Sequence, residues 1–401
     1  MSVSEIAISE LGRIVTGKTP STSNAAFFDG EYQFVTPTDL DWKTYYCRTT
    51  ERTVTDDAKK AHRNQFISAG TVMVTCIGNT IGKCGISSDD CLTNQQINSI
   101  IPDEGVNPEF VYYLLVQNTG LVRGVGLGGG SATPILNKTI FSNIKLRVPP
   151  RRSWDAIAAT LSAYDDLIEN NRRRIQLLEQ AARLLYKEWF VHLRFPGHEH
   201  VKIKDGVPEG WVKGVVADFY ATASGGTPSR KNPDFYVGDI PWVKTQELTG
   251  GFILSSDERI TEEAIKFSSA KLFPRHTVLV AMYGATIGQI AMLSVPSTTN
   301  QACCAVIPAA PGTTFAHAYL FLSHHKADLI GLGQGAAQKN ISQQVIKAVK
   351  MILPTKALLD AFAESVCPFF DQIELLQKMN INLEKARDLL LPRLMNGEVA
   401  V

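Results

Sequence analysis

The feature that most constrains the fold of this 401-residue chain is that its second half repeats its first. Gly17-Lys-Thr-Pro-Ser21 returns as Gly225-Gly-Thr-Pro-Ser229, and Gly78-Asn-Thr-Ile-Gly-Lys83 returns as Gly284-Ala-Thr-Ile-Gly-Gln289. Four further blocks return in the same order, with an offset that drifts only from 208 to 205 residues. Such self-similarity predicts two copies of one structural unit.

Each copy has a globular part followed by a long helix. Short β-type runs such as Thr71–Thr75, separated by turn residues and short helical stretches, predict an α+β domain. A long helical pattern follows Pro149-Pro150 and again Pro354. We therefore predict an α+β fold with a pseudo-twofold internal repeat. Its domains cover residues 1–150 and 207–353, and its spacer helices cover residues 151–195 and 354–396.

Both helical segments carry apolar residues at alternating steps of four and three, which is the spacing of a heptad seam. A single helix cannot bury such a seam, so we predict that the two helices form an antiparallel coiled coil. The residues predicted to pair are Ile157, Leu161, Ile168, Asn171, Ile175, Leu178, Leu185, Phe362, Val366, Phe369, Ile373, Asn380, Leu383 and Leu390.

Aligning the two seams by their midpoints fixes a register. It places Ile157 near Leu394, Trp189 beside Phe362, and Asn171 opposite Asn380. A buried asparagine pair lowers stability but specifies register. Pro196-Gly197 is expected to end the first helix, and Pro392 is expected to end or kink the second.

Composition restricts the function classes. The net charge of the chain is +1. Residues 1–150 contain 13 basic and 14 acidic residues, and residues 212–352 contain 12 basic and 9 acidic residues. Neither domain therefore has the excess of basic residues that is typical of a nucleic-acid binder. A neutral protein can still bind DNA if its cations cluster or a partner supplies phosphate contacts. Seven scattered cysteines, no secretion signal and no long apolar run indicate free thiols in the cytoplasm, with no membrane association.

No catalytic constellation occurs in the sequence. Gly331–Ala336 fits a dinucleotide-loop pattern, but it follows a helical stretch instead of a strand. Asn232-Pro-Asp-Phe235 differs from the Asn-Pro-Pro-Tyr/Phe site of amino-methyltransferases at Asp234 and lacks a cofactor loop, and His198-Glu-His200 lacks a third metal ligand. We predict a non-enzymatic chain without metal or cofactor.

Hydroxyl, amide and cationic side chains do gather on the repeated loops, where they suit contacts to phosphates and base edges. The candidate DNA-contacting residues are Lys18, Thr19, Ser21, Lys83, Thr227, Ser229, Arg230, Lys231, Lys244, Gln246, Gln289, Gln338, Lys339 and Asn340.

In this arrangement the chain resembles the specificity subunits of Type I restriction–modification systems. The resemblance rests on Gly225–Ser229, Gly284–Gly288, Lys339-Asn-Ile-Ser342, Leu184–Phe190 and Leu391–Glu398, in family order along nearly the whole chain. The first copy departs from the second where Lys18 replaces Gly226 and where Leu136-Asn137 replaces Ile341-Ser342.

The resemblance implies that each domain is a target-recognition domain that reads half of a bipartite, asymmetric DNA site, with the helices setting the gap. Two methyltransferase subunits and two restriction (motor–nuclease) subunits would be partners. S-adenosylmethionine, ATP and Mg would be held by those partners and not by this chain.

Three alternatives are left open by the residues. The chain could serve a Type IIB-like enzyme, it could be a DNA adenine methyltransferase that uses Asn232–Phe235, or it could be a coiled-coil scaffold that does not bind DNA.

Overall fold

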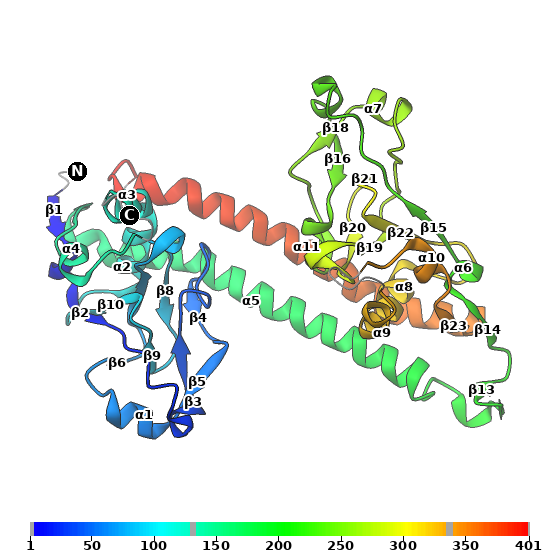
Figure 1. The fold of residues 1–401 in the computed structure, drawn as a ribbon, viewed down its shortest axis with the longest axis horizontal. Helices are drawn as coiled ribbons and strands as arrows, with labels where there is room; N and C mark the ends of the chain where they lie inside the picture. Colours follow the sequence, from blue (N-terminus) through cyan, green and yellow to red (C-terminus); the bar gives the residue numbers. More distant parts are fainter. Residues whose placement is uncertain (1–3, 129–133, 334–339, 400–401) are drawn as a thin grey trace. The chain divides into compact units, whose positions relative to one another are not determined.

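The computed structural model of the protein describes residues 4–128, 134–333 and 340–399 (Figure 1). The chain divides into two units: unit 1 comprises Met1–Glu169 and Asn382–Val401, and unit 2 comprises Asn170–Ile381. Each unit contains one globular α+β domain and a part of each of two long helices. These helices are α5 (Trp154–Tyr186) and α11 (Lys356–Met395). The predicted architecture of two α+β domains with two long helices is confirmed.

The first domain, in unit 1, is built on a five-stranded sheet with the strand order β2-β10-β7-β8-β4. The strands are β2 (Gly12–Thr16), β10 (Ile97–Pro102), β7 (Val72–Thr75), β8 (Cys84–Ser87) and β4 (Tyr46–Cys47). All neighbours are antiparallel except β4 and β8, which are parallel. All four residues of β7 are buried, as expected for a central strand that is covered on both faces.

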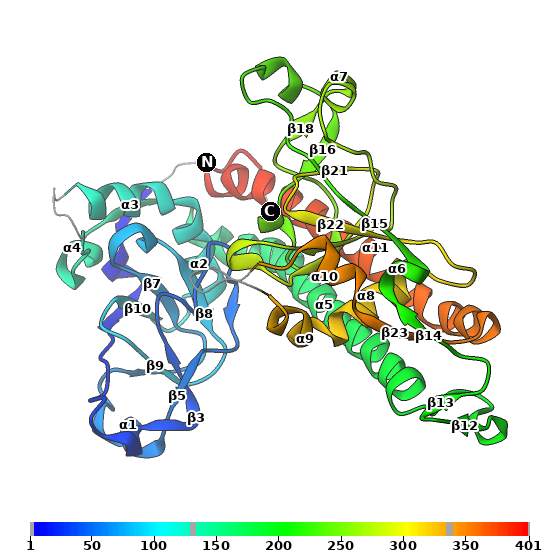
Figure 2. The same ribbon diagram turned by 45° about the vertical axis from the view of Figure 1, so that its right-hand side comes forward.

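A four-stranded sheet with the order β5-β3-β9-β6 completes the first domain. Its strands are β5 (Arg52–Val54), β3 (Phe28–Val35), β9 (Cys91–Thr93) and β6 (Phe66–Ile67). Helix α1 (Asp56–Ala61) lies beside β3 in both views (Figures 1 and 2). It begins at Thr55, whose side chain accepts a hydrogen bond from the Ala58 amide, and two aspartates occupy its first turn.

The second domain, in unit 2, repeats this topology. Its five-stranded sheet has the order β15-β22-β19-β20-β17, which matches the first sheet strand for strand. The strands are β15 (Tyr220–Ser224), β22 (Cys303–Pro308), β19 (Val278–Ala281), β20 (Ile290–Leu293) and β17 (Phe252–Ile253). A smaller sheet contains β18 (Arg259–Ile260), β16 (Ile240–Val243) and β21 (Thr298–Thr299). The repeat read from the sequence is therefore a repeat of structure.

Each domain also has a two-stranded sheet that leads into its long helix. In the first domain β1 (Ser4–Ala7) pairs with β11 (Lys145–Val148), and in the second β14 (Val212–Val215) pairs with β23 (Lys350–Leu353). Because β11 and β23 directly precede α5 and α11, this pairing anchors the start of each helix to its own domain.

One helix in each domain joins the sheet to the long helices. In α2 (Pro108–Gln117) six consecutive residues, Phe110–Leu115, are buried. They share one core with Ile157 and Leu161 of α5 and with Leu394 of α11. A helix that is apolar on all sides must be enclosed, and α8 (Phe315–His324) has the same role in unit 2.

The helix ends differ from the sequence prediction. The first long helix closes with a π turn at Lys187–Val191, and Leu193 then adopts a left-handed backbone with φ of 58°, so the helix ends before Pro196. Pro392, which was expected to end or kink the second helix, does not end it, because α11 continues to Met395, one residue before the expected bound at 396. Leu394 and Met395, beyond the proline, are buried in the core of unit 1, and this burial opposes the helix-breaking tendency of proline.

None of the helices in the three described segments has the length and apolar character needed to span a bilayer. All seven cysteines are free thiols, and six of them are buried. Burial raises the pKa of thiols such as Cys76 and Cys84, to about 11 and about 12, which makes them poor nucleophiles.

Candidate nucleic-acid interface

The loop after the first strand of each five-stranded sheet has the same geometry in the two domains. The Lys18 amide donates to the Thr93 carbonyl at 2.8 Å, and the Gly226 amide donates to the Thr299 carbonyl at 2.9 Å. Each loop is therefore hydrogen-bonded to the smaller sheet of its domain, through β9 or β21, and this bond fixes the position of the next residue, Thr19 or Thr227.

Both of these threonines contact a glutamine. The hydroxyl of Thr19 donates to Oε1 of Gln95 at 2.6 Å, and Thr227 makes the same bond to Gln301. The two glutamines are exposed and their amide groups can donate and accept in the pattern that matches the edge of adenine. These glutamines were not among the predicted candidates, although the dipeptide Asn94-Gln95 returns in the second copy as Asn300-Gln301.

The difference between Lys18 and Gly226 has a local cause. A Cβ atom at Gly226 would lie 2.3 Å from the backbone carbonyl carbon of Ser269, and the Gly226 carbonyl accepts a hydrogen bond from Nε1 of Trp242 at 2.9 Å. Only glycine fits this close approach. Lys18 is exposed in the first domain, so the two loops share a backbone but present different side chains.

The second repeated block is a tight turn after the central strand. Thr75 N–H donates to the Lys83 carbonyl at 2.9 Å, and Ala281 N–H donates to the Gln289 carbonyl at 2.8 Å. Internal contacts already hold the two side chains at the end of this turn. Lys83 Nζ donates to the Leu40 carbonyl at 3.0 Å, and Gln289 accepts from Lys326 Nζ at 2.9 Å. These contacts orient the two candidates without burying them fully.

An exposed tryptophan lies next to the turn of the first domain. Trp42 is 49% exposed, and the guanidinium carbon of Arg123 lies 4.8 Å from its ring centroid. Arg123 also donates to the Asn79 carbonyl of the turn at 3.1 Å, and Lys83 Nζ lies 5.9 Å from the same ring. This cluster of one aromatic and two cationic side chains was not predicted, because its members are distant in the sequence.

Two of the predicted cations in the second domain form an internal ion cluster. Arg230 and Lys244 lie 2.6 and 2.8 Å from the two carboxylate oxygens of Glu258. Hydrogen bonds from Arg230 and then Lys244 lower the pKa of Glu258 to about 2. Arg230 also packs against Tyr236, at 4.1 Å from its centroid. The three side chains together carry one net positive charge, so they attract a phosphate less strongly than two unpaired cations would.

The remaining candidates are dispersed. Ser21, Ser229, Lys231, Gln246 and Asn340 are exposed. Gln338 and Lys339 lie outside the described residues, as do residues 334–336 of the segment Gly331–Ala336. Of the described candidates, the structure brings Arg230 and Lys244 together on Glu258. It places Thr19 and Thr227 against Gln95 and Gln301, which were not among the candidates.

The departure at Leu136-Asn137 is chemically small. Asn137 caps α4 (Lys138–Ser142) by accepting from Ile140 N–H, and Ser342 caps α10 (Gln343–Lys347) by accepting from Val345 N–H. Leu136 N–H and Ile341 N–H donate to matching carbonyls, Cys76 and Met282, both at 2.9 Å. The two copies therefore place the same kind of cap at the same position.

The alternative motifs have structural uses. The side chain of Asn232 accepts from the Asp234 amide and begins a short 3-10 helix, Pro233–Tyr236. His198 and His200 each lie near Glu199, at 3.2 and 3.8 Å. In the part of the chain that the structure describes, no group of three His, Cys, Asp or Glu side chains could hold a metal ion.

The predicted helix seam and its register are confirmed within each unit. Asn171 Nδ2 donates to Asn380 Oδ1 at 2.8 Å, and the rings of Trp189 and Phe362 lie 5.5 Å apart. Ile157 shares a core with Leu394. Eight of the predicted seam residues are buried and the others are half-buried; the buried ones are Ile157, Leu161, Ile168, Asn171, Phe362, Val366, Ile373 and Asn380.

Comparison with known proteins gives consistent matches along the chain. Residues 2–180 and 208–385 each match the model of the Type I restriction modification DNA specificity domain. The MjaIX specificity subunit of Methanocaldococcus jannaschii is 28% identical over 98% of this chain and 93% of its own length. The HindI specificity subunit of Haemophilus influenzae is 24% identical over 73% of this chain and 78% of its own.

A solved structure has the same fold. The crystal structure of the S subunit of a Type I restriction–modification system from M. genitalium matches with a TM-score of 0.64 and 14% identity. The match covers 98% of this chain and 96% of that one.

Proposed function

The chain belongs to the family of Type I restriction–modification DNA specificity subunits, and on that premise we propose that its two domains each read one half of a bipartite, asymmetric DNA site. The observation that carries the proposal is one loop scaffold, built twice, with different side chains on it. Lys18 and Gly226 differ, as do Lys83 and Gln289, on matching backbones. Domains with the same shape and different contacts would read different half-sites.

Two domains are also what the energetics of recognition require. A mismatched base pair costs about 1–3 kcal/mol, so a single half-site of a few pairs cannot be distinguished in a genome. Two half-sites multiply the discrimination. We propose that α5 and α11 set the gap between the half-sites.

A second apolar stripe on the helices supports partner binding. Leu177 and Leu184 are seven residues apart on α5, so they share one face, and they are 55% and 62% exposed. Val191, in the π turn that follows, is 43% exposed. On α11 Leu375 and Leu389 are 57% and 68% exposed. These residues lie outside the seam, and we propose that helices of two methyltransferase subunits cover them. Two restriction (motor–nuclease) subunits would complete the assembly in the cytoplasm.

Catalysis is assigned to those partners. In this proposal S-adenosylmethionine, ATP and Mg are bound by the methyltransferase and restriction subunits, and this chain selects the site at which they act. Asn232, the residue that could have served a methyltransferase, caps a 3-10 helix with its side chain. A specificity subunit of a Type IIB-like enzyme would use the same DNA-reading domains. The two functions would be distinguished only by the genes of the partner subunits.

Methylome sequencing of a host that expresses the chain with its methyltransferase partner tests the proposal. We expect one methylated motif with two half-sites and a fixed gap. Replacing residues 1–150 with those of a relative should change one half-site and leave the other intact. A graft that changes both halves, or neither, would contradict the assignment of one half-site to each domain.

The alternatives give other results. A purified chain that binds S-adenosylmethionine by itself would favour a methyltransferase, and a methyltransferase complex that retains no duplex DNA would favour a scaffold. For partner binding, L177E/L184E should abolish co-purification with the methyltransferase. The control L272E changes a leucine of similar exposure, 52%, outside the helices. Equal effects of the two variants would contradict the stripe as the docking surface.

A further inference from the structure

The seam of the helix pair is less symmetric than the repeat that generated it. In the helices the repeat has an offset of 205 residues, as Leu178-Glu179 and Leu383-Glu384 show. A layer of the seam consists of one residue of α5 and the residue of α11 that faces it. Because of the repeat, each layer has a counterpart layer, which contains the two residues that lie 205 positions away from its own two. A symmetric seam would have layers of the same chemistry in both places.

Two layers break this rule. The counterparts of Asn171 and Asn380 are Leu376 and Ile175, so one layer is an amide pair and the other is aliphatic. A second layer joins Asp165 to Arg387, and its counterparts are Phe370 and Ala182, which share the apolar core of unit 2. Each polar layer thus corresponds to an apolar layer.

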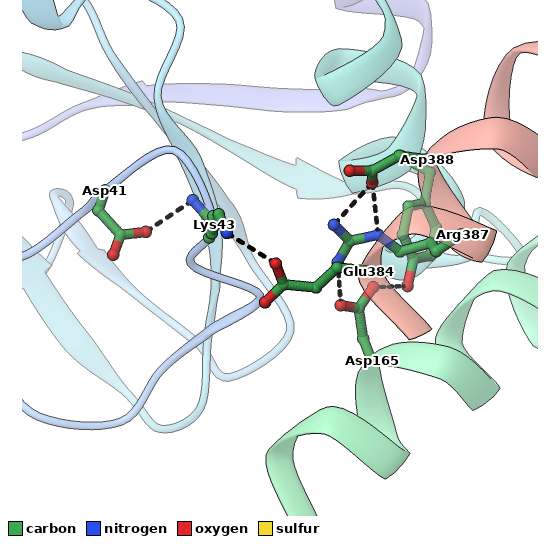
Figure 3. A network of polar contacts seen from close by, with 7 residues as sticks. Asp41, Lys43, Asp165, Glu384, Arg387 and Asp388 are labelled. Atoms are coloured by element: carbon green, nitrogen blue, oxygen red, sulfur yellow. Dashed lines mark hydrogen bonds and ion pairs between the residues drawn. The ribbon is translucent and has the colours of Figure 1, made fainter. Parts of the chain in front are cut away.

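The charged layer is well enclosed within unit 1. The side chains of Asp165 and Arg387 are 4% and 13% exposed. Tyr113 of α2 also donates to Asp165, at 2.5 Å. Asp388 lies 2.7 Å from Arg387, on the other side of the guanidinium from Asp165 (Figure 3). Burial by itself would lower the pKa of Arg387, but the charges of Asp165 and Asp388 more than offset burial and raise the pKa above its ordinary value.

From this pattern we infer that the seam face of α5 is built to accept an α11 face and to reject a second copy of α5, and that α11 likewise rejects itself. If two α5 helices were paired in this register, Asn171 would face Ile175 and Asp165 would face Ala182, each twice. Two α11 helices would place Asn380 against Leu376 and Arg387 against Phe370. Every polar side chain would lose its partner across the seam.

Such a loss is costly because a buried charge or amide without its partner keeps its desolvation penalty. A uniformly apolar seam would tolerate all three pairings about equally, since its layers would be interchangeable. The polar layers therefore select the pairing that a repeated chain would otherwise leave degenerate. This inference concerns assembly and does not depend on the proposed DNA recognition.

The test frees the two halves of the chain to choose partners. A protease site inserted between Asp205 and Gly206, at the exposed tip of the hairpin β12 (Ile203–Lys204) and β13 (Val207–Pro208), allows the folded full-length protein to be cut. The nicked protein is unfolded in urea and diluted. Native mass spectrometry then distinguishes mixed pairs from identical pairs by mass.

For the native sequence we expect identical pairs to form less than about one in a hundred of all pairs. The comparison variant D165F/N171L/N380I/R387A gives each polar layer the residues of its own counterpart. In this variant the fraction of identical pairs should rise toward about one half of all pairs. That is the fraction expected when the two fragments have equivalent helix faces and pair at random. Abundant identical pairs from the native sequence, or none from the variant, would overturn the inference.

A measurement on the intact chain covers the case in which nicked halves do not refold. N171L and N380I should each lower the urea midpoint of unfolding, and N171L/N380I should recover it, because the double variant copies the existing Leu376 and Ile175 layer. The same comparison applies to D165F, R387A and D165F/R387A. Additive changes in the midpoint would mean that the layers do not discriminate between partners.

Discussion

Replacing Glu374 with glutamine should destabilise the second domain at neutral pH and have little effect in acid. Glu374 lies on α11 with its side chain 4% exposed. Its carboxylate accepts from Ser294, from Arg275 at 2.6 Å and from Lys378 at 2.7 Å. Ser294 follows β20, so the carboxylate ties the sheet to the helix within unit 2.

The magnitude follows from the pKa. Burial tends to raise the pKa of Glu374, but the hydrogen bonds from Lys378, Ser294 and Arg275 outweigh burial and lower the pKa from 4.5 to about 2. That difference corresponds to about 3 kcal/mol of folding free energy. Arg275 and Lys378 are about half exposed, so solvent screens the ion pairs and we expect about 2 kcal/mol.

The sign of the pH dependence follows from a lowered carboxyl pKa. The stabilisation is complete above pH 4.5, the pKa expected in the unfolded chain, and it is lost as the pH falls toward 2. E374Q should therefore differ from the native protein by about 2 kcal/mol at pH 7 and by less than half of that near pH 3.

Hydrogen exchange in a urea series reports on this domain alone when peptides around β19 and β20 are followed. E364Q is the control, because Glu364 is an exposed residue of the same helix and should change stability by less than about 0.5 kcal/mol. Equal losses for E374Q at pH 7 and pH 3 would refute the electrostatic explanation, as would a loss no larger than that of E364Q.

Three further predictions concern pH, salt and length. Tyr220 and His317 share a buried hydrogen bond of 2.7 Å, and burial lowers the pKa of His317 from 6.5 to about 4, so the second domain should lose stability as the pH falls through this range. The midpoint temperature of thermal unfolding should depend less on pH in Y220F/H317F than in the native protein. An equal dependence on pH would exclude this pair as the cause. K18A and K231A should each weaken DNA binding by the methyltransferase complex uniformly across sequences and reduce its salt slope by about one, and an unchanged slope would exclude a phosphate contact. A seven-residue insertion in both long helices, beside Asn171 and beside Asn380, adds about 10 Å of helix. It should lengthen the gap between the two half-sites of the methylated motif by about three base pairs. An active variant that keeps the original gap would show that helix length does not set this gap.

The helix seam was predictable because it is a local pattern. A heptad spacing specifies which residues of a helix share a face, and two seams of similar length have few antiparallel alignments. The alignment by midpoints was enough to place Asn171 opposite Asn380, which the structure confirms at 2.8 Å. The repeated topology was predictable for a similar reason, since matching blocks in matching order imply matching strands.

The partners of individual charges were not predictable in this way. Residue type predicts Arg230 and Lys244 as DNA contacts, and the structure shows that both also pair with Glu258, at 2.6 and 2.8 Å. The cluster of Trp42 and Arg123 involves residues about eighty positions apart, and no periodicity links them. Residue type indicates what a side chain can bind, and only its neighbours decide whether that capacity is already used.

By itself, then, the sequence determined the duplication, the α+β class, the two long helices and their register, because each of these is recorded in spacing along the chain. The tertiary structure decided which polar groups meet. It placed Asp165 against Arg387 and Glu374 against Arg275, 222 and 99 residues apart. It also carried α11 through Pro392, because burial of Leu394 and Met395 stabilises a helix that local preference would end. Interactions of this kind depend on distance in space, and the order of residues along a chain does not contain that distance.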